Sequence, residues 1–238
     1  MSDTALTREE YIKKLLNNYN LIAVLANKND CKVLHLRNKQ LGRDLILRSF
    51  PQQIVAYQIL NQIIFENLPE IYDVIPLNDG QIVLEEFISG ITVADVMESG
   101  NYNYRGAKRV LTSVCNALQI LHKNGIVHRD IKPQNIIISD VGKVFLIDLN
   151  ISRKISVNTK DTVVMGTVGY ASPEQLGIAQ SDTRTDIYAL GVLLNVMLTG
   201  KHPSESLATG KAKKIIKTCT SINPNDRYQS VSEFVNSL

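Results

Sequence analysis

The sequence has few cysteines, and no two of them are close along the chain. Among 238 residues there are three, Cys31, Cys115 and Cys219, with no Cys-x-x-Cys pair. An odd count at such wide spacing argues against a disulfide framework and against a zinc site. We therefore expect a reducing, cytoplasmic setting.

The sequence also lacks a long apolar run and an excess of one charge. Its longest apolar-rich stretch, 187–198, is interrupted by Gly191 and Asn195, whereas a bilayer span needs about 20 apolar residues. The N-terminal residues are polar and acidic, unlike a secretory signal. Lysines and arginines number 26 against 23 acids, a net charge of +3, which does not favour a polyanionic partner. We expect neither a membrane nor a nucleic acid partner.

The composition is that of a folded globular chain. Hydrophobic residues make up 44% and charged residues 21%, so the chain can bury a large core. Its length suits one large domain or two small lobes. A capping box from Thr7 to Glu10 predicts a short first helix. Beyond it, the pattern predicts strands over 19–25, 32–36, 44–50, 71–75 and 81–87, and a helix over 54–64.

After Gly90 the apolar period changes from that of strands to that of helices. Apolar residues recur every three or four positions over 107–121, and this helix is expected to stop at Asn124-Gly125. The segment 186–198 is apolar on nearly all sides, which predicts a helix surrounded by others. The boundary between the strand-rich and helix-rich parts is placed at 87–90.

One motif between the two predicted helices carries specific chemistry. It reads His128-Arg129-Asp130-Ile131-Lys132-Pro133-Gln134-Asn135, and Asp148 follows after a predicted hairpin. This is similar to the H-R-D-x-K-P-x-N catalytic loop of protein kinases, with six fixed positions matched. The chain resembles the bacterial, eukaryotic-like (Hanks-type) serine/threonine protein kinases over nearly its full length, in a compact form with a degenerate first lobe.

The resemblance implies a fold and an activity. The fold is α+β and two-lobed over 1–238, with a small five-stranded antiparallel sheet and one helix in 1–87 and a larger, mainly helical lobe in 88–238. The activity is transfer of the ATP γ-phosphate to Ser or Thr hydroxyls of a protein substrate, with Mg²⁺ as cofactor.

The same resemblance implies roles for four residues. Phosphoryl transfer is mostly positioning and charge stabilisation, with oxygen ligands holding magnesium against the triphosphate. Asp130 is expected to be the catalytic base, and Lys132 to steady the transferring phosphate. Asn135 and Asp148 are expected to hold the metal.

Further matches lie downstream, in Gly166-Thr167-Val168-Gly169-Tyr170-Ala171-Ser172-Pro173-Glu174. By resemblance, Glu174 pairs with Arg227, and Asp186 ties the buried helix to the catalytic-loop backbone. Thr167 is expected to contact the catalytic aspartate.

The segment from Asp148 to Glu174 resembles an activation loop. A phosphate at Thr159 or Thr162 could pair with Arg129 and order this loop. One hypothesis is therefore autophosphorylation at one of these threonines. The alternative is that their hydroxyls only contact solvent.

The first lobe departs from the family pattern. Residues 25–33, where a glycine-rich phosphate loop is expected, contain no glycine, and Arg48 stands at the place of the phosphate-binding lysine. The predicted helix 54–64 has no acid for the usual ion pair, and Asn150 replaces the glycine after Asp148-Leu149.

Two hypotheses follow from these departures. In one, Arg48 or Lys28 supplies the missing positive charge and the chain is an enzyme. Lys28 is the better substitute, because strand alternation turns Lys32 away from the side that Val33 faces. In the other, the chain is a pseudokinase that acts as a nucleotide-binding or non-binding scaffold.

The adenine is expected between apolar walls, with two backbone groups meeting its edge. The walls are Val33 and Ile46 above and Ile137 below, and the backbone groups are those of Glu86 and Ile88. Glu85 stands at the gatekeeper position, either as a solvated acid at a strand end or paired with Arg48.

Overall fold

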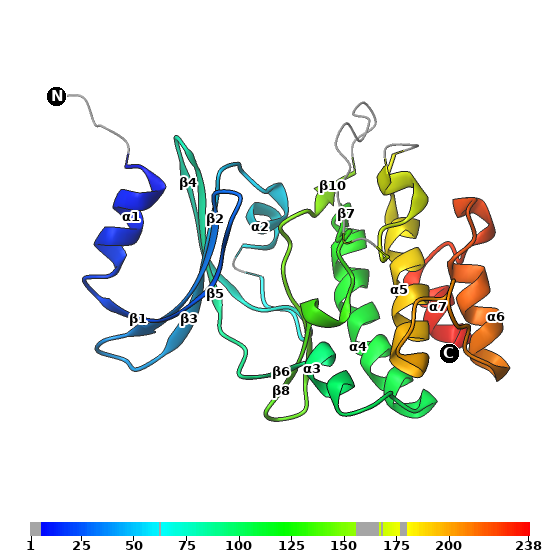
Figure 1. Cartoon of the computed structure of the whole chain (residues 1–238). Coiled ribbons are helices and arrows are strands. Elements are labelled where there is room, and N and C mark those ends of the chain that lie inside the picture. Colours follow the sequence, from blue (N-terminus) through cyan, green and yellow to red (C-terminus); the bar gives the residue numbers. More distant parts are fainter. Residues whose placement is uncertain (1–5, 62, 156–166, 168, 177–179) are drawn as a thin grey trace. The chain divides into compact units, whose positions relative to one another are not determined.

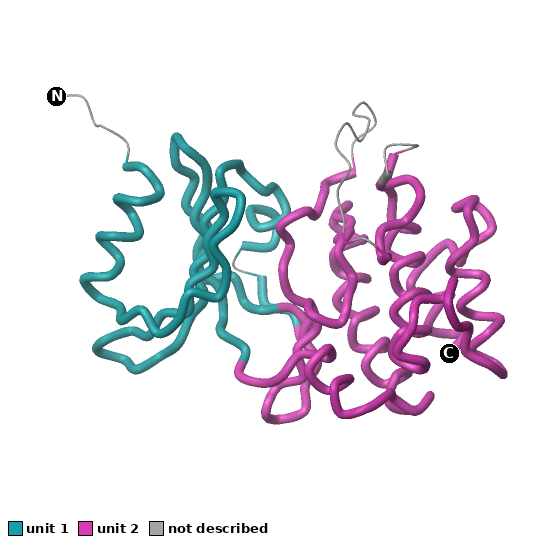
Figure 2. The backbone as a smooth tube through the Cα atoms, viewed as in Figure 1, with its two compact units in different colours: residues 1–65, 69–88 teal, residues 66–68, 89–238 magenta. Residues whose placement is uncertain are grey.

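The structure, a computed structural model, describes residues 6–61, 63–155, 167, 169–176 and 180–238. The chain forms two compact units: unit 1 comprises residues 1–65 and 69–88, and unit 2 comprises residues 66–68 and 89–238 (Figure 2). Unit 1 holds a five-stranded antiparallel sheet, and unit 2 holds the long helices. The predicted α+β, kinase-like fold class is confirmed.

The sheet of unit 1 has the strand order β1-β2-β3-β5-β4, and all its pairs are antiparallel. Its strands are β1 (Tyr19–Lys28), β2 (Cys31–Asn38), β3 (Asp44–Phe50), β4 (Ile71–Leu77) and β5 (Gly80–Glu86). Arg48 pairs with Val33 on one side and with Val83 on the other. Because side chains alternate along a strand, these three residues share one face of the sheet.

Two helices cover opposite faces of this sheet, α1 (Arg8–Leu15) and α2 (Val55–Leu60) (Figure 1). Ile12 of α1 joins the apolar core made by alternate residues of the central strands, Leu47 of β3 among them. On the other face, the ring of Tyr57 in α2 stacks on Phe50, with centroids 5.6 Å apart. The capping box predicted at Thr7 begins α1.

Helix α2 is shorter than the predicted helix 54–64. It ends at Leu60, because Asn61 leaves the helical region with ψ of 133°. Asparagine side chains compete for backbone hydrogen bonds and so favour helix ends over interiors.

Unit 2 is built around α5, which is buried on nearly all sides as predicted. Its helices are α3 (Val93–Glu98), α4 (Tyr104–Lys123), α5 (Thr183–Thr199), α6 (Gly210–Cys219) and α7 (Val231–Ser237), with short 3₁₀ turns at η1 (Pro133–Asn135), η2 (Pro173–Leu176) and η3 (Pro224–Asp226). Its strands are β6 (Gly90–Thr92), β7 (Ile126–Val127), β8 (Ile136–Ser139), β9 (Val144–Leu146) and β10 (Arg153–Lys154). Among the residues that the structure describes, no helix combines the length and apolar character needed to cross a bilayer.

Candidate active site

The catalytic-loop motif begins directly after β7, and its backbone is fixed by α5. Asp186, fully buried, accepts hydrogen bonds from the backbone amides of His128 at 3.0 Å and Arg129 at 2.8 Å. Arg129 has a positive φ of 70°, which a non-glycine residue adopts at a cost that these bonds offset. The predicted tie between Asp186 and this backbone is confirmed. His122 of α4 adds a contact at 2.8 Å that the sequence analysis missed.

His128 is a packing residue of this loop. Its side chain is fully buried, and burial lowers the pKa of the imidazole below its ordinary value. Its Nδ1 accepts a hydrogen bond of 3.3 Å from the backbone amide of Asp130, so this histidine supports the backbone of the loop.

Asp130 lies at the centre of a compact hydrogen-bond network. Its Oδ1 accepts a hydrogen bond of 2.7 Å from Thr167 Oγ1, and its Oδ2 accepts one of 2.8 Å from Asn135 Nδ2. Lys132 Nζ lies 2.7 Å from Oδ2 and donates to Thr167 Oγ1 at 2.8 Å. The predicted contact between Thr167 and Asp130 is confirmed, and three side chains hold one carboxylate.

This network keeps Asp130 ionised. Burial alone would raise the pKa of the carboxyl, but the hydrogen bonds from Lys132 and Thr167 outweigh it and lower the pKa below its ordinary value. At neutral pH the group is therefore a carboxylate, able to accept a proton or a hydrogen bond.

Asn135 and Asp148 are neighbours through the backbone. The amide of Ile147 donates to the carbonyl of Asn135 at 2.9 Å, which brings the following residue, Asp148, next to η1. Asn135 Nδ2 is turned toward Asp130, so its amide oxygen points elsewhere. Two residues beyond Asp148, Asn150 Oδ1 is buried without a hydrogen-bond partner among the described residues. Amide and carboxylate oxygens form the donor set that Mg²⁺ prefers, so these residues fit that ion.

Two further interactions involve η2, the 3₁₀ turn that holds Glu174 and Gln175. Arg227 donates to both carboxylate oxygens of Glu174, at 2.7 and 2.9 Å, and both residues are buried. This confirms the predicted pair. Gln175 donates to the carbonyl of Arg129 at 2.9 Å, a support that the sequence analysis missed because a glutamine after an acid carries no distinct signal.

In unit 1, Arg48 and Glu85 form a buried ion pair. Arg48 Nε donates to Glu85 Oε1 at 2.6 Å, and the residues are 5% and 4% exposed. Arg48 pairs in register with Val83, two residues before Glu85, so the pair is diagonal across neighbouring strands on one face. The predicted alternative of a pair is confirmed, and that of a solvated strand-end acid is wrong.

The apolar residues predicted for the adenine fall in both units. Val33 and Ile46 lie on the same face of the unit 1 sheet as Arg48, since alternate residues of a strand share a face. At the end of unit 1, Ile88 is buried and the amide of Glu86 donates to the carbonyl of Glu70 at 2.8 Å. Ile137 lies in β8 of unit 2.

Lys28 is the last residue of β1 and is exposed. It pairs with Cys31, so the turn between β1 and β2 consists of Asn29 and Asp30 alone. Lys32 contacts Glu9 of α1. This places Lys32 on the face opposite Val33, as strand alternation predicted.

The comparisons with known proteins agree with this geometry. A family model described as the protein kinase domain matches residues 31–238. The chain belongs to the protein kinase family.

This kinase domain is similar to several bacterial proteins. A probable serine/threonine-protein kinase of Clostridium perfringens is 32% identical over 208 residues, covering 85% of this chain and 30% of that protein. Serine/threonine-protein kinase PknB of Mycobacterium tuberculosis is 32% identical over 180 residues, covering 63% and 29%. A probable serine/threonine-protein kinase of Corynebacterium efficiens is 31% identical over 188 residues, covering 66% and 28%. The chain thus spans less than a third of these relatives' length.

The predicted phosphorylation sites of the kinase domain, Thr159 and Thr162, lie outside the described residues. Their predicted partner Arg129 is 6% exposed, and burial lowers the pKa of its guanidinium.

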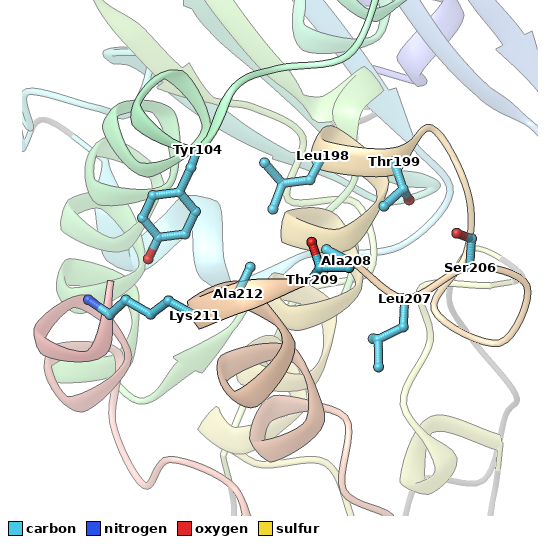
Figure 3. A pocket seen from close by; sticks show the side chains of 9 residues that line it. All are labelled: Tyr104, Leu198, Thr199, Ser206, Leu207, Ala208, Thr209, Lys211 and Ala212. Atoms are coloured by element: carbon cyan, nitrogen blue, oxygen red, sulfur yellow. The ribbon is translucent and has the colours of Figure 1, made fainter.

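A separate hollow of about 490 Å³ lies in unit 2 (Figure 3). It is lined by Tyr104, Leu198, Thr199, Ser206, Leu207, Ala208, Thr209, Lys211 and Ala212. The lining contains neither a carboxylate nor a residue of the catalytic loop, so it lacks the carboxylate base that phosphoryl transfer to a hydroxyl uses.

Proposed function

We propose that the chain transfers the γ-phosphate of ATP to Ser or Thr hydroxyls of a protein substrate. The observation that carries this proposal is the Asp130 carboxylate with Lys132, Thr167 and Asn135 around it. Serine/threonine specificity is supported by Lys132, which lies within hydrogen-bond reach of Asp130, and by the printed names of the bacterial relatives.

The proposed step is a direct displacement at phosphorus. The substrate hydroxyl oxygen forms a bond to the γ-phosphorus, the bond from that phosphorus to the β,γ-bridging oxygen breaks, and ADP leaves. The hydroxyl proton passes to Asp130. Among the described residues, Oδ1 of Asp130 accepts one hydrogen bond, from Thr167, and a carboxylate oxygen can accept a second. Lys132 provides positive charge beside the transferring phosphoryl group.

Asn135 and Asp148 are the proposed magnesium ligands. When bound, Mg²⁺ neutralises charge on the triphosphate oxygens. The side chain of Asn135 has a second task, because its Nδ2 holds the Asp130 carbonyl at 2.9 Å and so fixes the base.

The nucleotide contacts proposed for unit 1 follow from its sheet. Arg48 and Lys28 are proposed to contact phosphates, and Val33 and Ile46 to face the adenine. The backbone amide of Glu86 already donates a hydrogen bond to the carbonyl of Glu70. The proposed contact of Glu86 with the base edge therefore uses the backbone carbonyl of Glu86. A backbone group of Ile88 is likewise proposed to meet the base edge. For Ile137, which lies in β8 of unit 2, contact with the adenine stays an expectation from the resemblance.

Transfer of radiolabelled phosphate from ATP to a generic protein substrate tests this function. The variant Asp130→Asn should lose about 100-fold or more in kcat, since a general base contributes roughly that much. Asp226→Asn makes the same chemical change at an exposed position and should behave like the unsubstituted chain. Equal transfer by Asp130→Asn and the unsubstituted chain would refute the proposal.

The scaffold hypothesis finds no support in these observations, because Lys132, Thr167 and Asn135 surround the Asp130 carboxylate in the way that the proposed reaction requires. Autophosphorylation at Thr159 or Thr162 stays part of the proposal. Intact mass after incubation with Mg-ATP should rise by one or more phosphates, and less so in the variant with both threonines changed to alanine. An unchanged mass would count against autophosphorylation while leaving transfer to other proteins testable.

A further inference from the structure

Helix α1 precedes the segment that the family model matches, which begins at residue 31. Its first residue, Arg8, is only 8% exposed although it opens a helix at the surface of the sheet. A buried arginine needs partners for its charge and its donors.

The partners of Arg8 lie in two turns of unit 1. Arg8 Nη1 donates to the Asp30 carbonyl at 2.9 Å and Nη2 donates to Asp30 Oδ2 at 2.5 Å. Nη1 also lies 3.2 Å from Ser49 Oγ in β3. The backbone amide of Arg8 donates to both carboxylate oxygens of Asp79, at 3.0 and 3.1 Å. One residue therefore links α1 to the β1–β2 turn and to the β4–β5 turn.

The β1–β2 turn has the geometry of a tight hairpin. Asn29 and Asp30 have positive φ values of 52° and 61°, as a type I′ turn requires. Asparagine and aspartate tolerate this region better than most residues, so the turn needs no glycine. Arg8 holds both the carbonyl and the carboxylate of Asp30, which fixes the peptide plane and the side chain together.

The sheet makes room for this arginine. A Cβ at Gly80 would come 3.0 Å from Arg8 Cδ and 1.9 Å from the Phe50 carbonyl oxygen. Beyond Arg8, Ile12 is buried against the sheet. At the other end of the helix, Lys39 donates to the carbonyls of Leu16 and Asn17 at 3.0 and 2.9 Å.

We propose that Arg8 is a positioning residue of this kinase domain: by gripping Asp30 it holds the β1–β2 turn, and Lys28 at its edge, in one conformation for the phosphates of ATP. The inference rests on the proposed function, in which Lys28 contacts phosphate. It explains how a segment without glycine serves nucleotide binding. A turn fixed in advance loses less conformational freedom when the ligand binds.

The test compares Arg8→Met with Lys39→Met in the full chain. Arg8→Met keeps an apolar stem for packing but releases Asp30, and we expect KM for MgATP to rise about fivefold with kcat within about twofold. Amide hydrogen exchange at residues 28–31 should accelerate. Lys39→Met removes two tethers of the same helix far from the turn and should change neither quantity. Asp30→Asn keeps the turn conformation and should shift KM in the same direction as Arg8→Met, by less.

The outcomes separate the two proposals. An unchanged KM for Arg8→Met in an active enzyme overturns the positioning role, as does an equal shift for Lys39→Met, which would indicate general loosening of α1. If the unsubstituted chain transfers no phosphate, the proposed function fails. Hydrogen exchange then tests whether Arg8 holds the β1–β2 turn. Faster exchange at 28–31 in Arg8→Met alone then supports the grip on the turn, and unchanged exchange overturns it.

Discussion

Charged side chains are held in different ways in the two units. In unit 2, the residues of the catalytic-loop motif follow the kinase pattern, and the charged group at its centre, Asp130, is fixed by short contacts to Lys132 and Thr167. In unit 1, the expected lysine and glycines are absent, and other residues take up their places. Arg48 is paired with Glu85 on the adjacent strand, where the resemblance implied a partner on a helix.

Under the proposed function, the difference indicates which features of the kinase fold can be replaced. A base must stand at one point relative to the reacting hydroxyl, so its neighbours are strictly specified. A phosphate-binding cation needs charge and a fixed position, and two strands of one sheet can supply both. Because β3 and β5 are joined by a ladder of backbone hydrogen bonds, the Arg48 guanidinium keeps its place without an acid from α2.

The largest expected effect lies in the buried pair of unit 1. Arg48→Met removes the arginine of this buried ion pair, and breaking such a pair costs about 3–5 kcal/mol of the free energy of unfolding. Changing Arg48 and Glu85 both to methionine should restore most of that stability, as measured by urea unfolding. Nucleotide affinity should stay low in the double variant. Recovered affinity would show that the pair serves the fold alone.

In unit 2, Lys132→Met should reduce kcat by about 100-fold or more, since it removes a charge placed for the transition state. KM for MgATP should change little, because Lys132 contacts Asp130 and Thr167 and belongs to the unit that is proposed to act on the γ-phosphate. Steady-state kinetics measures both parameters. A larger effect on KM than on kcat would contradict the proposal that unit 2 performs the transfer while unit 1 binds the nucleotide.

Acid should destabilise unit 2. Its buried carboxyls, Asp186 and Glu174, have pKa values below their ordinary 3.8 and 4.5: burial opposes ionisation, but the hydrogen bond from His122 to the former and those from Arg227 to the latter outweigh it. A carboxyl with a lowered pKa contributes stability that is complete above its unfolded pKa and is lost as pH falls through its folded pKa. Hydrogen exchange between pH 6 and 3 should therefore show protection falling in α5 below about pH 4.5. The variant Glu174→Gln should be less stable than the unsubstituted chain at neutral pH, and its stability should depend less on pH. If the protection of α5 in this variant fell with pH as it does in the unsubstituted chain, the account of Glu174 would be contradicted.

The smallest effect is expected for Glu85→Gln. Glutamine keeps the shape and a hydrogen-bond acceptor for Arg48 but removes the negative charge, so the guanidinium is held less firmly. We expect a several-fold weaker affinity for ATP, measured by titration calorimetry. Asp73→Asn, which changes an exposed acid of β4, is the matched control. Identical affinities for Glu85→Gln and the control would argue against the positioning of Arg48 by Glu85.

The sequence allowed much of the fold and of unit 2 to be predicted because the relevant signals are local. The catalytic motif and the apolar period of α5 can be recognised from the chain alone, and Asp186 and Arg227 were found through the resemblance. Contacts between distant segments carried no such signal. Arg8 meets Asp30 and Asp79 only once the sheet is folded, and the length of α2 depends on the conformation of Asn61.

The account depends most directly on whether unit 1, with its altered residues, still serves a magnesium-dependent nucleotide site. Titration of the chain with ATP, with and without Mg²⁺, and of Asp148→Asn under the same conditions, measures this. We predict binding that is about tenfold or more tighter with magnesium, a gain that Asp148→Asn loses. Absence of binding, or binding that is indifferent to both magnesium and Asp148, would contradict the account.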